Sequence, residues 1–333
     1  MAELLKMKKP KMVAEAAAAQ KGLHIVLEIL VFVAVFLVCN IAELVVIMPV
    51  EIILMFTNPD YLNAAVRGDM QGAQEAAAAL AQSDSLVIAM LFANVGIILV
   101  TLLFCKLLQK RKVTTVGFQK PGMWKEYLSG MGIGFVIFSL AVLICVVTGS
   151  LKIQGLSATF SIGIFILFLL GYLIQGMAEE VMCRGYFLVS VSRRYPLAVG
   201  IVANAVLFAA LHLLNSGISV LAFINLVLFG VFASIYFIKR GNIWGVGALH
   251  SIWNLAQGNV YGIRVSGMQT SCSVLASEMV TGRELINGGD FGLEGGLAVT
   301  FVLVLGSVIL LTTRQQRCVE ESAAVPAETS ADM

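Results

Sequence analysis

Long runs of apolar residues, separated by short polar stretches, cover most of the chain. A run of about twenty apolar residues is long enough for an α-helix to cross a bilayer. The runs lack the alternation of about ten-residue strands that a membrane β-barrel requires, so the pattern predicts an all-α polytopic helical bundle. The stretch 61–85, rich in Ala and Gln, predicts a short external helix. About eight transmembrane helices are expected, near residues 24–50, 85–108, 127–148, 161–188, 196–214, 218–238, 243–262 and 296–313.

Composition supports an integral membrane protein whose main partner is the lipid bilayer. The 333 residues are 59% hydrophobic and 13% charged, and the mean hydropathy is +0.92. A soluble surface cannot accommodate this composition. We expect a basic cytoplasmic segment over 1–21, an integral domain over 22–313 and a disordered cytoplasmic tail over 314–333. The net charge of +2 is too small to indicate a nucleic-acid partner.

Lys and Arg residues gather on alternate sides of the predicted spans. By the positive-inside rule, the loops that are rich in Lys and Arg face the cytoplasm. An even number of spans then places both termini in the cytoplasm, as expected for a multi-pass protein of the bacterial plasma membrane. The basic groups are Lys6 to Lys11 before the first span, Lys106 to Lys120 after the second, and later Arg193 with Arg194, Lys239 with Arg240, and Arg314 with Arg317.

Three charged residues lie inside one apolar stretch, residues 162–191. Glu179 and Glu180 are followed by Arg184, and unpaired charges at this depth cost several kcal/mol. Residues four apart share a helix face, so Glu180 and Arg184 are predicted to pair. Glu179 points elsewhere and is a candidate general base. The alternative is that all three form an ion-paired network that only holds helices together.

Two further polar pairs recur at helical spacing in later spans. Phe208 and His212 are four residues apart, as are His250 and Asn254. Counting helical rise from the nearest basic pairs gives depths of roughly 21, 27 and 15 Å for Glu179, His212 and His250, within a core of about 30 Å. The four polar groups are therefore predicted to meet inside the membrane. A lone intramembrane His can also serve only as a hydrogen-bonding group between helices.

The three motifs together resemble those of a known family of intramembrane proteases. Residues 179–185 resemble the EExxxR signature of the CAAX prenyl protease and bacteriocin-processing (CPBP, or Abi) family, which includes the type II CAAX prenyl endopeptidases. Phe208 to His212 is similar to its FxxxH motif, and His250 to Asn254 to its HxxxN motif. The likeness covers a motif core of about residues 160–260, and the stretch 288–295 is similar to bacterial members. Cys183 departs from the pattern, where the family usually has an aromatic residue.

The resemblance implies hydrolysis of a peptide bond by an activated water. It implies that Glu179 is the general base, that His212 holds the water, and that His250 with Asn254 forms an oxyanion hole. Glu180, Arg184 and Phe208 complete the motifs as supporting residues. The expected substrate is a membrane-associated peptide, either prenylated (CAAX-type) or bacteriocin-like, and no cofactor is expected.

Three alternatives remain open at this stage. The first is a zinc-dependent version of the same protease, with zinc held by Glu179, His212 and His250. The second is a non-catalytic bacteriocin-immunity protein that binds a peptide in the same cavity. The third is a transporter or proton relay, although no paired broken helices or inverted repeat support it.

Overall fold

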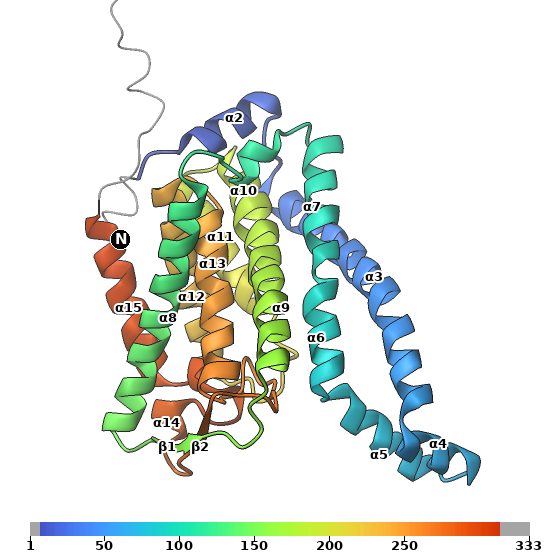
Figure 1. Cartoon of the computed structure of the whole chain (residues 1–333). Helices are drawn as coiled ribbons and strands as arrows, with labels where there is room; N and C mark the ends of the chain where they lie inside the picture. Colours follow the sequence, from blue (N-terminus) through green and yellow to red (C-terminus); the bar gives the residue numbers. More distant parts are fainter. Residues whose placement is uncertain (1–6, 314–333) are drawn as a thin grey trace, which may run out of the picture.

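Helices that run between two opposite ends of the molecule make up most of the structure (Figure 1), a computed structural model that describes residues 7–313. The predicted disordered tail, 314–333, lies outside the described residues. The helices are α2 (Lys11–Ala19), α3 (Ile25–Thr57), α4 (Pro59–Val66), α5 (Met70–Ala81), α6 (Asp84–Ala93), α7 (Val95–Leu107), α8 (Met123–Val147), α9 (Ile162–Glu180), α10 (Val189–Ser192), α11 (Leu197–Ala210), α12 (Val220–Arg240), α13 (Trp244–Leu255), α14 (Glu284–Asn287) and α15 (Leu297–Thr312), with two π-helical segments, η2 (Val181–Leu188) and η3 (Ala256–Val260), and three short 3₁₀ turns, η1 (Val113–Val116), η4 (Gly289–Phe291) and η5 (Leu293–Gly295).

Five helical stretches within residues 7–313 are long and apolar enough to cross a membrane. They are Ile25–Thr57, Asp84–Leu107, Met123–Val147, Ile162–Ser192 and Val220–Arg240. Two shorter apolar helices, α11 and α15, lie at other predicted spans, and α13 followed by η3 lies at the remaining one. The chain is therefore a multi-helix membrane protein, while the count of eight spans and the orientation of the termini stay predictions.

Local sequence signals explain where several of these helices begin and end. Ser219 caps α12 by accepting a hydrogen bond from the amide of Ala222, and Gly241, at φ 66°, ends it in the left-handed conformation. Pro196 precedes α11 and prevents the long α9–α10 stretch from continuing into it. The chain turns at these points, which places successive helices antiparallel.

Two features near one end of the molecule differ from the predicted pattern. The single external helix expected over 61–85 is wrong: α4 and α5 are separate, because Gly68 adopts φ 69° and Asp69 caps α5. A two-stranded antiparallel sheet, β1 (Leu151–Leu156) with β2 (Leu275–Met279), is also present in an otherwise helical fold. The two strands lie more than a hundred residues apart in the sequence, so no local sequence pattern predicts that they pair.

The two ends of the helical bundle carry different structures (Figure 1). We call the end with β1, β2 and α14 the sheet end. The opposite end carries α2, η1 and α10, and we call it the basic end because many Lys and Arg residues gather there. Both names refer only to position within the molecule.

Helix α13 lies in the middle of the bundle, packed against α8 and α9. Glycines allow this close approach. A Cβ on Gly134 would lie 2.3 Å from the carbonyl oxygen of Leu249, and one on Gly176 would lie 2.5 Å from the amide nitrogen of Ser251. The motif helices α9 and α13 are thus held in direct backbone contact.

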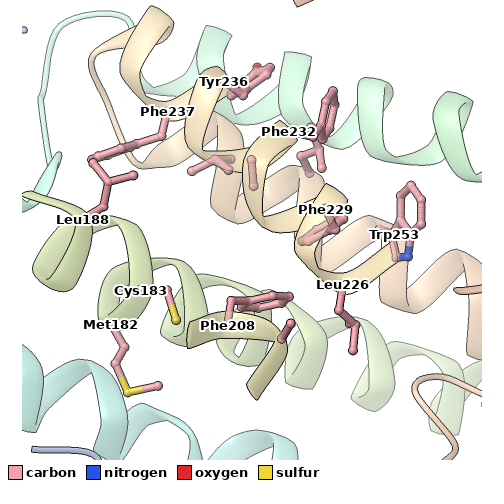
Figure 2. Packing of buried hydrophobic residues seen from close by; sticks show 14 of the residues in the cluster. Met182, Cys183, Leu188, Phe208, Leu226, Phe229, Phe232, Tyr236, Phe237 and Trp253 are labelled. Carbon is pink, nitrogen blue, oxygen red and sulfur yellow. The ribbon is translucent and has the colours of Figure 1, made fainter. Parts of the chain in front are cut away.

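Aromatic side chains fill the space between these helices and α11 and α12 (Figure 2). The Phe229 ring stacks on Phe208 at a centroid distance of 5.7 Å and meets Trp253 edge-on at 5.5 Å. The rings of Phe208 on α11 and Phe229 on α12 therefore lie against α13, beside the motif residue His250.

A buried arginine supports the π-helical segment η2, which follows directly after Glu180. Arg111 donates from Nη2 to the carbonyl of Gly185 at 2.9 Å and from Nη1 to the carbonyl of Tyr186 at 3.4 Å. π-Helical turns leave carbonyls without their usual i+4 partners. Arg111 supplies donors to two of these carbonyls and so helps to fix the helix that carries Arg184.

Candidate active site

One cavity of about 430 Å³ brings together the four residues that sequence analysis placed at the centre of the site. Glu179 lies at the end of α9, His212 just beyond α11, and His250 with Asn254 on α13. The cavity is lined by Val87, Met90, Leu91, Asn94, Tyr172, Gln175, Glu179, Phe208, His212, Asn215, Ser216, Leu226, Phe229, His250, Asn254, Val265, Ser266, Gly267, Met268 and Glu294.

Glu179 directs its carboxylate into this cavity. Its Oε1 atom accepts a hydrogen bond from the side-chain amide of Gln175. Its Oε2 atom lies 3.9 Å from Nε2 of His250, and the side chain is 21% exposed. A carboxylate with one fixed oxygen and one oxygen facing open space is suited to accept a proton from a bound water.

Glu180, the next residue, has different surroundings. Its Oε1 atom accepts hydrogen bonds from Nη1 of Arg184 at 2.8 Å and from Nδ1 of His250 at 2.9 Å. Its side chain is fully buried. The structure therefore contains the Glu180–Arg184 pair expected from helical spacing. Of the two adjacent glutamates, Glu179 reaches the cavity, and Glu180 connects α9 to α13 through His250.

Arg184 and Phe208 form a second contact between the motif helices. The guanidinium carbon lies 4.5 Å from the centre of the Phe208 ring and 5.9 Å from that of Phe229. Cations over aromatic faces are attracted to the negative ring face, by about 2 kcal/mol or more where water is excluded. Phe208 thus supports the ion pair of Glu180 with Arg184.

His212 is fixed through one ring nitrogen. Its Nδ1 donates to the carbonyl oxygen of Phe208 at 2.9 Å, and its ring lies 4.8 Å from that of Phe208. This bond leaves the other nitrogen, Nε2, for a different partner, and His212 lines the cavity. A neutral imidazole held in this way accepts a hydrogen bond at Nε2, as a water-holding residue would.

Gln175 is a site residue that sequence analysis missed. Its side-chain oxygen accepts a hydrogen bond from Nδ2 of Asn254 at 3.0 Å, while its amide donates to Glu179. It therefore connects Asn254 to Glu179 across α9 and α13. A signal was present, because Gln175 is a polar residue in an apolar stretch, one helical turn before Glu179.

Glu294 is a second carboxylate in the cavity wall, within the stretch 288–295. It accepts hydrogen bonds from the amide and hydroxyl of Ser266 at 2.9 and 2.7 Å and from the indole N–H of Trp253 at 3.2 Å. These bonds tie the loop at residues 265–268 to α13. No periodicity predicts this position, because Glu294 lies in a 3₁₀ turn.

The zinc alternative finds no ligand cluster in this geometry. Within residues 7–313, no group of three or more His, Cys, Asp and Glu side chains is arranged to hold a metal ion. His250 uses Nδ1 for Glu180, and His212 uses Nδ1 for a backbone carbonyl. Histidines that bind zinc are commonly oriented in this way through the other ring nitrogen, so these contacts favour neither mechanism, and the choice between glutamate and zinc chemistry is left to experiment.

Comparison with known proteins agrees with the motif resemblance. Residues 161–256 match the family model described as type II CAAX prenyl endopeptidase Rce1-like. No curated protein and no solved structure matches the chain. The matched region begins at the start of α9 and ends just beyond α13, so it contains the three motifs and the helices α9, α11 and α13 that carry them. The segment 161–256 of this membrane protein is therefore an Rce1-like domain, as the CPBP-family motifs predicted.

Proposed function

We propose that this protein is an intramembrane endopeptidase that hydrolyses a peptide bond with a water activated by Glu179. The observation that carries the proposal is the position of this carboxylate. It faces the cavity beside His250, while its neighbour Glu180 is buried and paired with Arg184. The Rce1-like match of residues 161–256 supports protease chemistry of the CAAX type.

The proposed reaction begins with a water between Glu179 and His212. Glu179 takes one proton as the water oxygen attacks the carbonyl carbon of the scissile bond, and His212 accepts a hydrogen bond from the same water at Nε2. The resulting tetrahedral intermediate carries a negatively charged oxygen. Its C–N bond then breaks, and the proton on Glu179 passes to the leaving amine nitrogen. Atoms and charge balance without a metal or other cofactor.

His250 and Asn254 are the proposed donors to the oxyanion. His250 is oriented by Glu180 through Nδ1, which leaves Nε2 toward the cavity when the ring is protonated. Asn254 donates to Gln175 in the substrate-free arrangement, so its amide must turn toward the substrate. Loss of one such donor typically lowers kcat by about 10²- to 10³-fold.

The test compares wild type with Glu179→Gln on a quenched peptide library in lipid nanodiscs, with and without a zinc chelator. We expect wild type to cleave, Glu179→Gln to lose cleavage, and the chelator to have no effect. A matched control is Glu278→Gln, since Glu278 is an exposed residue of β2. Activity lost to the chelator and restored by zinc would replace the proposal with metal catalysis. A folded wild type that binds peptides without cleaving them would favour the immunity-protein alternative.

A further inference from the structure

Within residues 7–313, the loops that line the cavity belong to one end of the molecule. Outside the α-helices, the described lining residues are Asn94 between α6 and α7, His212, Asn215 and Ser216 after α11, the loop 265–268, and Glu294. Asn215 donates to the carbonyl of Ser266 at 3.1 Å, and Glu294 accepts hydrogen bonds from Ser266. The segment after α11, the loop 265–268 and Glu294 form one connected group at the sheet end, and Ser216 within it is exposed.

The opposite side of the cavity is closed by packed side chains. Every residue from Val181 to Arg193 is buried. Leu188 and Phe237 point toward one another in this layer (Figure 2). Buried Arg111 fills the space beside η2 with hydrogen bonds to Gln109 and Thr115.

Helix α2 adds a further layer beyond this packing. It contacts α10 and η1, and its side chains Met12, Val13 and Ala16 are buried. No residue of the loops at the basic end is among the described residues that line the cavity. A peptide that approaches from the basic end meets a packed surface, whereas one that approaches from the sheet end meets an opening.

The distribution of charge assigns these ends to the two sides of the membrane. Within residues 7–313, the sheet end carries few basic residues, Arg67, Lys152, Arg264 and Arg283. Loops rich in Lys and Arg face the cytoplasm, which places the sheet end outside. The basic end carries Lys8, Lys9, Lys11, Lys21, Lys106, Lys110, Arg111, Lys112, Lys120, Lys125, Arg193, Arg194, Lys239 and Arg240.

We propose that the substrate is a membrane-associated polypeptide whose scissile bond lies on the extracytoplasmic side and enters the cavity from the sheet end. This inference rests on the proposed endopeptidase function. It adds the side of the membrane from which the substrate enters the site. A substrate confined to the cytoplasm would meet the packed layer of η2, α10 and α2 instead.

The charge of the cavity also selects the kind of peptide segment that fits. Its described lining includes two carboxylates, Glu179 and Glu294, two imidazoles, His212 and His250, and the phenol of Tyr172, and none of its described lining residues is Lys or Arg. A free C-terminal carboxylate would enter beside two carboxylates and, with no Lys or Arg in the described lining, would compete with Glu179 and Glu180 for His250. An internal peptide bond, flanked by neutral or basic residues, avoids this cost. Apolar walls at Val87, Met90, Leu91 and Leu226 suit apolar side chains of the substrate.

The activity test uses membrane vesicles of both orientations and a membrane-impermeant quenched peptide, amidated at its C-terminus, that the protein cleaves in nanodiscs. We expect cleavage in right-side-out vesicles, and in inside-out vesicles only after detergent is added. Glu179→Gln in each preparation reports background proteolysis. Cleavage confined to intact inside-out vesicles would overturn the inference and leave the endopeptidase proposal standing. Failure of wild type to cleave any library peptide in nanodiscs would overturn the endopeptidase proposal itself.

A labelling test addresses access even if no substrate is found. Ser216→Cys at the cavity and Lys112→Cys at the basic end are treated with an impermeant maleimide in intact cells. The described native cysteines are buried, and Cys318, outside the described residues, is replaced by Ser. We expect Ser216→Cys to react at once and Lys112→Cys to react only after permeabilisation. The reverse pattern would overturn the assignment of the cavity to the outer side.

Discussion

Gln175 is the residue that joins the two halves of the candidate site. It lies between Glu179, the proposed base, and Asn254, a proposed oxyanion donor, and bonds to both. By fixing one carboxylate oxygen, it orients the other toward the cavity. Gln175 is therefore a positioning residue in this proposal.

Replacing Gln175 with Leu should lower kcat by about 10- to 100-fold with little change in KM. The lost hydrogen bond to a charged group contributes about 1.5–3 kcal/mol, which converts to this range of rates. Steady-state cleavage of a library-derived peptide measures both constants. Gln269→Leu, at an exposed loop position, is the control and should match wild type. Equal kcat values for Gln175→Leu and wild type would show that Glu179 is oriented without Gln175.

At this scale, sequence spacing predicts contacts within a helix and misses those between helices. The Glu180–Arg184 pair follows from one turn of helix and is present. The contact of His250 with Glu180 and the role of Gln175 depend on how α9 and α13 pack. Glu294 was also missed, because its partners Trp253 and Ser266 come from distant parts of the chain. The catalytic roles of Glu179, His212, His250 and Asn254 stay predictions.

At the scale of elements, the position of α13 depends on the glycines of α8. A Cβ on Gly130 would lie 2.0 Å from the carbonyl oxygen of Gly245, and Gly134 meets Leu249 almost as closely. Small residues at a four-residue spacing allow helix backbones to approach within membranes. Since His250 follows Leu249 directly, this contact sets the depth and rotation of the HxxxN motif.

Gly134→Val should destabilise the protein and reduce cleavage, because its side chain would push α13 away from α8. Overpacking of this kind costs roughly 1–3 kcal/mol. The melting temperature in detergent and kcat in nanodiscs measure the two effects. Gly132→Val is a matched control on the same helix, since a Cβ there has no neighbour within 4 Å. If both variants melted and cleaved like wild type, α8 would not set the position of α13.

The predicted spans agree with the observed helices where apolar runs are long and end at clear breaks. The break at Pro196 is an example, because proline cannot continue α10 into α11. The π-helical form of η2 was not predicted, and its hydrogen bond from Arg111 comes from a distant part of the chain. The split of α4 from α5 was visible in the sequence at Gly68 and Asp69, but the Ala-rich composition obscured it.

At the scale of the whole molecule, an ion pair closes the basic end. Arg193, just after α10, donates from Nη2 to Glu28 in the first turn of α3 at 3.1 Å, and both side chains are buried. Arg193 also donates to the carbonyl of Gln20, beyond α2. One guanidinium therefore connects α2, α3 and α10.

Glu28→Gln should lower the melting temperature markedly, because it leaves a buried guanidinium without its counter-ion. Breaking a buried pair costs about 3–5 kcal/mol. Thermal unfolding in detergent measures the change. Glu15→Gln is the control, since Glu15 pairs with Lys11 on an exposed surface of α2 and should melt close to wild type. Identical melting temperatures for the two variants would contradict a closing role for Glu28.

The length of α3 connects the thickness of the surrounding bilayer to the cavity. Its 33 residues extend about 50 Å at 1.5 Å per residue, well beyond a hydrocarbon core of about 30 Å. A helix this long fits the bilayer by tilting away from the bilayer normal, and the tilt angle increases as the bilayer becomes thinner. Helix α3 packs against α6, and Val87, Met90 and Leu91 of α6 line the cavity. A change in the tilt of α3 therefore moves one wall of the cavity, so the length of the lipid chains affects the width of the substrate path.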